Sequence, residues 1–320
     1  MIKSIAIIAG EPNSINSEII AKAWIKKKKQ KLFVIGNYLL LKKQLDKIGF
    51  KFKLSKVNSF NEIKNGKSLE VLNVPLKFKS ISKINTSSSK IYIFKCFDLA
   101  HSLAFNKKVK GFINAPVDKK IFNNKYLGVT EYLADKNNLK NKEIMMIYNK
   151  KLSVVPLTTH VEIKNVTKKI KKDLIKKKVI LLSKHYKKLI NKKPKIVVLG
   201  LNPHNSENRV NSIEKKVIGP AVKSLRKLGI DIKGPYPADT IFSNIKKLNF
   251  NIIVGMYHDQ VLAPFKALYR YDAINITLGL KYLRISPDHG TAKDIIGLKK
   301  ANPQSLISAI NFLSKVNDKT

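Results

Sequence analysis

Cysteine and long apolar runs are both scarce in this 320-residue chain. Cys96 is the only cysteine, so neither an intrachain disulfide nor a cysteine metal cage can form, which fits a reducing cytoplasm. No run approaches the roughly 18 apolar residues of a membrane span. The apolar run at residues 5–10 is also too short for the core of a signal peptide. We therefore expect a cytoplasmic protein that makes no use of a membrane.

Arginine is scarce as well, although the chain is strongly basic. Only four of the 63 basic residues are arginine, the net charge is +42, and the lysines are spread along the whole chain. Proteins that read nucleic acids use the guanidinium group for most specific contacts, so we expect no specific nucleic-acid partner. A positive field of this size would instead attract small anionic molecules.

Glycine-rich nucleotide motifs are missing too. None of the 14 glycines forms G-x-G-x-x-G or a Walker A loop, so a Rossmann pyrophosphate site is not supported. With 44% hydrophobic and 26% charged residues, the composition is that of a globular protein long enough for two domains.

Short apolar segments alternate with helical patterns from end to end. Strands are expected within residues 4–9, 32–35, 111–114, 153–157, 195–201, 251–256 and 273–278, and helices within 17–29, 91–105, 168–188, 217–228 and from 302 onward. This alternation predicts an α/β fold with largely parallel sheets. The polar interval 55–89 is expected at the surface. We expect one domain at residues 1–128 plus 300–320 and a second at 129–299.

Three of the six histidines share a position relative to predicted strands. His160, His204 and His258 each follow the carboxyl end of a short buried strand. Such ends line the ligand crevice of open α/β sheets, so three strands could aim three imidazoles at one point. Three neutral nitrogen ligands leave coordination positions open, as a catalytic metal requires. The pattern predicts a divalent metal shared by these histidines, and Zn, Co, Mn and Mg all stay open.

Other polar residues stand at comparable places. Residues 257–260 put four hydrogen-bonding side chains directly after a buried strand, which is costly unless they are used. Residues 286–292 form a polar turn that we expect to open a helix, where anions bind readily. Arg284 follows a strand and could make a bidentate contact with a carboxylate or phosphate through its guanidinium group. Asp239 could be an acid/base group or the cap of the next helix.

These segments resemble one known enzyme family. The stretches GEP (10–12), NAPVDK (114–119), PLTTH (156–160), GLNPH (200–204), GPYPADTIF (234–242), MYHDQ (256–260), INITLGL (274–280) and RISPDHGTA (284–292) run in the order of the 4-hydroxythreonine-4-phosphate dehydrogenases of pyridoxal phosphate biosynthesis. The resemblance implies a two-domain α/β/α fold of the isocitrate and isopropylmalate dehydrogenase type, with the active site in the cleft between the domains. It also explains how a nicotinamide enzyme can lack the Rossmann motif.

The resemblance also implies roles for residues. His160, His204 and His258 would hold one divalent metal ion per active site, built between the two chains of a homodimer. Thr130, Lys266, Asn275 and Arg284 would contact the substrate, and Asp239 and Lys266 would assist proton transfer. NAD or NADP would oxidise 4-phosphooxy-L-threonine to a 3-oxo acid, which then decarboxylates to 3-amino-2-oxopropyl phosphate. The cofactor-binding residues stay unassigned.

The chain departs from the family pattern at three places. Val129 stands where the family usually has a substrate-contacting histidine, and residues 13–16 and 205–208 replace glycine-rich loops. Asparagine tolerates positive φ best among the non-glycine residues, so the backbone shape of these loops could survive. Two alternatives therefore stay open: a paralogue that oxidises D-threonate or D-erythronate 4-phosphate, and a family member that binds ligand with weakened catalysis.

Overall fold

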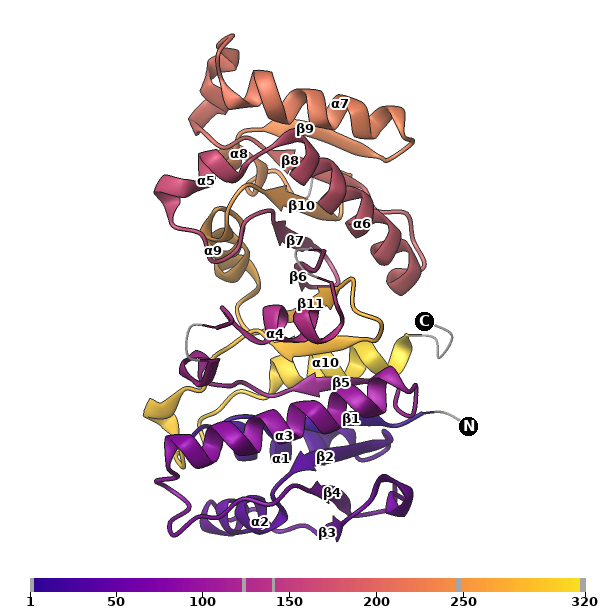
Figure 1. Cartoon of the computed structure of the whole chain (residues 1–320), viewed down its shortest axis with the longest axis vertical. Helices are drawn as coiled ribbons and strands as arrows, with labels where there is room; N and C mark the ends of the chain where they lie inside the picture. The colour runs from indigo at the N-terminus through magenta and orange to yellow at the C-terminus, as the bar shows by residue number, and fades with distance from the viewer. Residues whose placement is uncertain (1–2, 123–124, 140–141, 246–248, 317–320) are drawn as a thin grey trace. The chain divides into compact units, whose positions relative to one another are not determined.

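The computed structural model describes residues 3–122, 125–139, 142–245 and 249–316. These residues form two compact units (Figure 1). Unit 1 comprises residues 1–129, 271–274 and 281–320, and unit 2 comprises residues 130–270 and 275–280. The segment 281–299, expected in the second domain, groups with unit 1, because its strand pairs with a strand near residue 112.

Unit 1 is built on a parallel sheet with the strand order β3-β4-β2-β1-β5-β12. Its strands are β1 (Ile5–Ile8), β2 (Leu32–Gly36), β3 (Leu54–Val57), β4 (Leu69–Asn73), β5 (Gly111–Asn114) and β12 (Arg284–Pro287). Its helices are α1 (Asn16–Lys27), α2 (Tyr38–Lys47), α3 (Thr86–Phe105) and α10 (Gln304–Lys315), with short 3-10 turns η1 (Phe60–Glu62), η2 (Lys119–Phe122) and η5 (Lys293–Ile295). Every residue of β1, β2 and β5 is buried, as expected for strands covered on both faces.

Unit 2 carries the strand order β11-β6-β7-β10-β8-β9. Its strands are β6 (Ile144–Tyr148), β7 (Ser153–Pro156), β8 (Ile196–Leu199), β9 (Ile232–Tyr236), β10 (Ile252–Gly255) and β11 (Ile274–Leu278). Its helices are α4 (Val129–Lys136), α5 (Ile163–Lys169), α6 (Lys172–Ile190), α7 (Gly219–Lys227), α8 (Ala238–Ile241) and α9 (His258–Tyr269), with a 3-10 segment η3 (Pro203–Asn208) and a π-turn η4 (Glu214–Ile218). β6 pairs with β7 in the antiparallel sense, while β7, β10, β8 and β9 are parallel neighbours.

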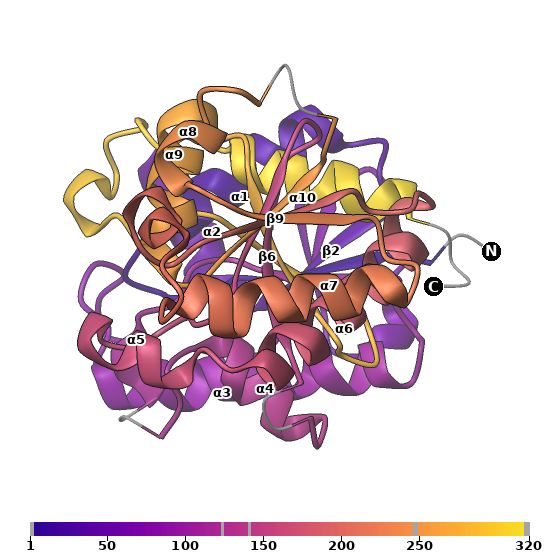
Figure 2. The same ribbon diagram turned by 90° about the horizontal axis from the view of Figure 1, so that it is seen from above.

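Helices cover both faces of each sheet. In unit 1, α3 packs on β1, β2 and β5 from one side, and α1 and α10 lie together on the other (Figure 2). In unit 2, α6 and α7 pack against each other on one side, and α9 contacts β7 and β10 from the other. This layering confirms the α/β fold predicted from the alternation of elements.

Most of the interval 55–89 is exposed or half-buried, as expected, but one segment of it is not. It contains β4, in which Leu69, Val71 and Leu72 are each at most 2% exposed. β4 pairs with both β2 and β3, so its apolar face is buried inside unit 1. The sequence does not indicate this buried strand, because its apolar run is short and Asn-Gly and serine residues dominate the composition around it.

Gly10 lets the chain turn sharply after β1. Its φ is +72°, a conformation that glycine adopts without steric cost. A Cβ atom there would lie 2.6 Å from the carbonyl oxygen of Pro116, in the segment that follows β5. Glycine therefore brings the GEP loop directly against the NAPVDK segment, and Glu11 donates its backbone N–H to Pro116.

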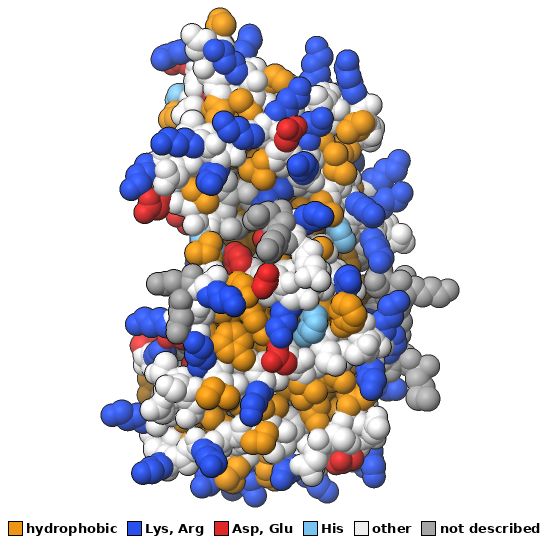
Figure 3. All heavy atoms as spheres, in the orientation of Figure 1, with side chains coloured by type: hydrophobic (Ala, Val, Ile, Leu, Met, Phe, Trp, Pro, Cys, Tyr) orange, Lys and Arg blue, Asp and Glu red, His pale blue; other side chains and the backbone are white. Residues whose placement is uncertain are grey.

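The helices and the distribution of basic side chains bear on whether a membrane or a nucleic acid is a partner. No helix in the described ranges is long and apolar enough to cross a membrane. In Figure 3, Lys and Arg side chains lie scattered over the visible face among apolar and neutral side chains. This dispersion matches the spread of lysine along the sequence.

Candidate functional site

Three neighbouring parallel strands of unit 2 end at the same edge of its sheet. β10 pairs in parallel with β7 on one side and with β8 on the other. His160 follows β7, His204 follows β8, and His258 begins α9 directly after β10. The arrangement of the strands is therefore the one that the sequence predicts.

Two of the three histidines lie close together. The ring centroids of His160 and His258 are 6.4 Å apart and their planes are tilted by 31°. Each ring has a carboxylate at Nδ1: Oε1 of Glu131 lies 3.3 Å from His160, and Oδ1 of Asp259 lies 2.8 Å from His258. A carboxylate at Nδ1 favours the tautomer that carries hydrogen there and leaves Nε2 as a metal ligand. The donor chemistry of this pair fits a divalent metal.

His204 does not complete that pair within one chain. Among the described residues, no group of three or more His, Cys, Asp or Glu side chains is placed to hold a metal ion. His204 lies in η3, where it and the next three residues all have φ between 48° and 55°. The prediction that the three histidines share one metal ion stays a prediction, because the resemblance places that site between two chains. After β8 the chain follows a left-handed path, and His204 lies exposed on it.

Glu214 anchors this loop, and sequence reasoning missed it. One of its carboxylate oxygens accepts the backbone N–H groups of Leu201 and Asn202 at 2.9 and 2.8 Å, and the other accepts the Ser206 hydroxyl at 2.9 Å. Burial alone would raise the pKa of Glu214, but these hydrogen bonds outweigh it and hold the pKa below its usual value. The loop that carries His204 is thus fixed by a buried, ionised carboxylate.

The predicted substrate contacts Thr130 and Asn275 lie around β11. The Thr130 hydroxyl, at the start of α4, is 3.4 Å from the hydroxyl of Thr277. Residues two apart in a strand point to the same face, so Asn275 shares a face with Thr277. The buried Oδ1 atom of Asn275 has no hydrogen-bond partner within the described part of the chain. A buried oxygen without a hydrogen-bond donor suits a ligand that donates a hydrogen bond.

Asp239 and Lys266 are both exposed in unit 2. Asp239 lies in the first turn of α8 without capping it, since no side-chain cap bond is formed there. The cap interpretation is therefore wrong, although a carboxylate in a first turn still suits the helix dipole. α8 packs against η3, the segment of His204. Lys266 lies on α9, eight residues after His258, which is a rise of about 12 Å along the axis.

Arg284 lies at the strand ends of unit 1. It begins β12, is only 3% exposed, and donates from Nε to Oδ1 of Asn114 at 2.7 Å. Asn114 ends β5 and is 2% exposed. A guanidinium group held in one orientation by a hydrogen bond is suited to contact a carboxylate or phosphate. The sequence indicated Arg284 but not the asparagine that orients it.

A second group of charged residues lies in the same unit. Nζ of Lys293 is 2.8 Å from Oδ2 of Asp118, and this contact holds the pKa of Asp118 below its ordinary value. Burial raises the pKa of Glu11, and the nearby charge of Asp118 raises it further. The segment 286–292 leads only to the three-residue turn η5. The expectation that it opens a helix able to bind anions was therefore wrong.

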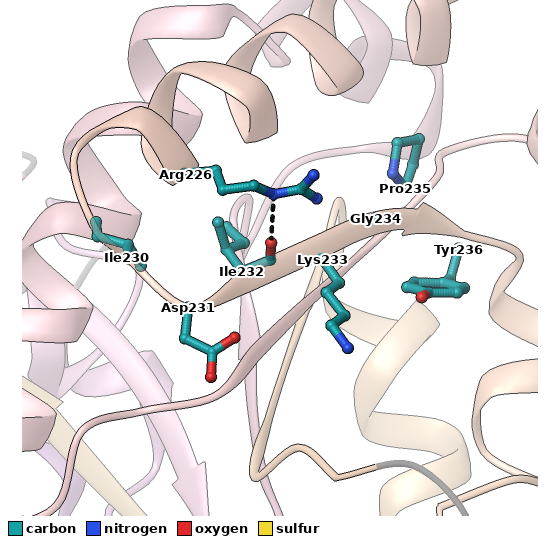
Figure 4. A pocket seen from close by; sticks show the side chains of 8 residues that line it. All are labelled: Arg226, Ile230, Asp231, Ile232, Lys233, Gly234, Pro235 and Tyr236. Carbon is teal, nitrogen blue, oxygen red and sulfur yellow. Dashed lines mark hydrogen bonds between the residues drawn. The ribbon is translucent and has the colours of Figure 1, made fainter.

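An open hollow lies elsewhere on unit 2. About 700 Å³ of space opens beside β9, where Arg226 donates from Nε to the carbonyl oxygen of Ile232 at 3.3 Å (Figure 4). The hollow is lined by β9 and the residues just before it together with Arg226, and by none of the predicted site residues. The predicted metal ligands follow the strand ends and do not line this surface.

Comparison with known proteins gives one consistent family. The family model described as "Pyridoxal phosphate biosynthetic protein PdxA" matches residues 28–313. A 4-hydroxythreonine-4-phosphate dehydrogenase from Sulfurihydrogenibium sp. is 38% identical over 317 residues, covering 96% of each chain. The solved 4-hydroxythreonine-4-phosphate dehydrogenase of Klebsiella pneumoniae superposes with a TM-score of 0.83 at 29% identity, covering 97% of this chain and 98% of that one.

A more distant structure bears on the fold alone. A beta-decarboxylating dehydrogenase from Thermococcus kodakarensis superposes with a TM-score of 0.50 at 12% identity, covering 99% of this chain and 85% of that one. This likeness supports the kinship in fold that the sequence motifs implied. The match of the family model and the full-length relatives confirm the resemblance, and the chain belongs to the PdxA family of pyridoxal phosphate biosynthetic proteins.

Proposed function

We propose that this protein oxidises 4-phosphooxy-L-threonine with NAD or NADP, using a divalent metal ion at a site shared by two chains. The observation that carries the proposal is the pair of His160 and His258, each with a carboxylate at Nδ1. Membership of the family supports the substrate, because the relatives carry the name of that activity.

The third metal ligand in this proposal is His204 of the partner subunit. Within one chain, His160 and His258 lie together while His204 is exposed on a loop held by Glu214. A homodimer with two-fold symmetry could place each chain's His204 beside the other chain's pair and so form two equivalent sites. Asp239 would accompany His204, because α8 packs against η3.

The proposed reaction follows from the residue types present. The hydroxyl-bearing carbon of the substrate loses a hydride and its hydroxyl loses a proton, giving a 3-oxo acid. This acid releases carbon dioxide, and the carbon that carried the carboxyl group takes up a proton to give 3-amino-2-oxopropyl phosphate. When bound, the cation would supply Lewis acidity at that oxygen and the nicotinamide would take the hydride. Asp239 and Lys266 are the proposed groups for proton transfer.

The remaining residues would bind and orient the substrate. Asn275 offers a buried carbonyl oxygen on the face of β11 next to Thr130. Arg284 would pair with a substrate anion, a role for which its buried guanidinium is already oriented by Asn114. Lys266, on the same helix as His258, would also contact the substrate.

Val129 favours a second candidate function. Its side chain is 9% exposed at the start of α4, next to Thr130, and it can donate no hydrogen bond. A site without this donor would suit D-threonate or D-erythronate 4-phosphate, or a ligand that is bound without turnover. The first candidate function and the paralogue differ in the acid that is oxidised, whereas a binding protein oxidises none.

A direct assay separates these candidates. We expect the purified protein with NAD or NADP and a divalent metal to give a rise in NADH or NADPH absorbance with 4-phosphooxy-L-threonine. Val129→His should raise kcat/KM for that substrate about 10- to 100-fold, the value of one hydrogen bond to a charged group. Val129→Leu, which adds no donor, serves as the control. A rise in absorbance only with D-threonate or D-erythronate 4-phosphate would favour the paralogue. Bound metal without turnover of any of the acids would contradict the assignment as an enzyme.

A further inference from the structure

Glu131 contacts His160 from a different element of unit 2. It lies in the first turn of α4, and its Oε1 atom is 3.3 Å from Nδ1 of His160. The side chains of Glu131 and His160 are 23% and 28% exposed, so water only partly screens their interaction. A carboxylate in this position can accept the Nδ1 hydrogen of a neutral imidazole.

A second acidic residue and a lysine lie behind Glu131. Burial raises the pKa of Glu143, and the negative charge of Glu131 adds to this effect. Lys178, on α6, is affected by both carboxylates: burial lowers its pKa, while Glu143 and Glu131 oppose that change. Glu131 on α4, Glu143 just before β6 and Lys178 on α6 thus influence one another electrostatically beside His160. Charges that are partly buried interact more strongly than exposed ones, because water screens them less.

The carboxylate beside His258 stands in a different environment. Asp259 lies 2.8 Å from Nδ1 of His258, but its side chain is 77% exposed and follows the histidine directly in the chain. An exposed side chain loses more conformational freedom when it is held in one place and is screened by water. The two histidines therefore differ in how firmly a carboxylate orients them.

We propose that Glu131 is a positioning residue for the metal site: it accepts the Nδ1 hydrogen of His160 and so turns Nε2 toward the cation. This inference rests on the proposed function, because it takes His160 to be a ligand. Carboxylates that hold metal-binding histidines in this way typically contribute about 10- to 100-fold to metal affinity. Glu131 acts through His160 and needs no contact with the substrate.

The test compares metal affinity among matched variants. We expect Glu131→Gln to weaken binding of Zn²⁺ or Co²⁺ to the purified dimer about 10- to 100-fold, measured by competition with a chelator. Glu131→Asp should recover part of the affinity, and Asp259→Asn should lose less than about 3-fold because Asp259 is exposed. Glu162→Gln is the control, since Glu162 is exposed near His160 and pairs with Lys164.

A second readout separates positioning from damage to the fold. Activity of Glu131→Gln should return to within a few-fold of wild type at saturating metal, with KM for the substrate unchanged. Wild-type metal affinity in Glu131→Gln would overturn the inference and leave the proposed function intact. Activity that stays low at saturating metal would also overturn it. If His160→Ala leaves metal binding unchanged, the proposed function itself fails, whatever Glu131→Gln does.

Discussion

His258→Ala is expected to abolish measurable turnover. The variant removes one of the two proposed metal ligands that this chain brings together, whose ring centroids are 6.4 Å apart. A metal ion contributes several kcal/mol to the stabilisation of developing charge, so kcat/KM should fall about 10³-fold or more. The bound metal, measured on the purified protein, should fall below one tenth of the wild-type content.

The control for this variant is His101→Ala. His101 contacts the hydroxyl of Tyr282 through Nδ1 at 2.8 Å in unit 1, and nothing places it in the metal site. It should keep its metal and its kcat, with at most a lower melting temperature. Full metal content in His258→Ala would contradict the assignment of His258 as a ligand.

Arg284→Lys is expected to cost about 10²-fold in kcat/KM. A lysine keeps the charge but loses the planar fork and cannot make the Nε bond to Asn114 at 2.7 Å. Removing one partner of a desolvated, hydrogen-bonded charge pair typically costs about 2–5 kcal/mol. Most of the change should fall on KM for the phosphorylated substrate, which initial-rate measurements would show.

Two further variants make this result specific. Arg226→Lys changes an exposed arginine that bonds only the carbonyl oxygen of Ile232 among the contacts described, and it should leave KM unchanged. Asn114→Ala removes the acceptor while keeping the guanidinium, and it should raise KM by about 10-fold. If Arg284→Lys folds, keeps its metal and shows a normal KM, Arg284 does not bind the substrate.

Much of the fold follows from local patterns in the sequence. Short runs rich in Ile and Val mark β7, β8 and β10, and their alternation with helices predicts parallel pairing. The helix expected within residues 168–188 is less exact: α6 begins at Lys172, and its buried residues are Ile175, Val179, Leu182 and Tyr186. Ile170 is buried too, but it lies between α5 and α6.

The sequence predicts a site residue only where its place after the end of a strand determines where it lies. His160 and His258 follow neighbouring strands and do meet, as expected. His204 follows a strand as well, but it lies in a left-handed segment anchored by Glu214 and joins no group of three possible ligands among the described residues. Neither Glu131 nor Asn114 shows a local signal, because their partners are 29 and 170 residues distant. Contacts of that range, and contacts with a second chain, leave no periodicity to detect.

The central claim is that each active site takes His160 and His258 from one chain and His204 from the other. Dimers purified through two different tags, one on a His204→Ala chain and one on a His258→Ala chain, test it directly. Each parent homodimer should be inactive, whereas the mixed dimer should regain about half of the wild-type activity, because one of its two sites is intact. Mixed dimers of His160→Ala and His258→Ala chains should stay inactive. If the first mixed dimer is as inactive as its parents, the shared site is contradicted.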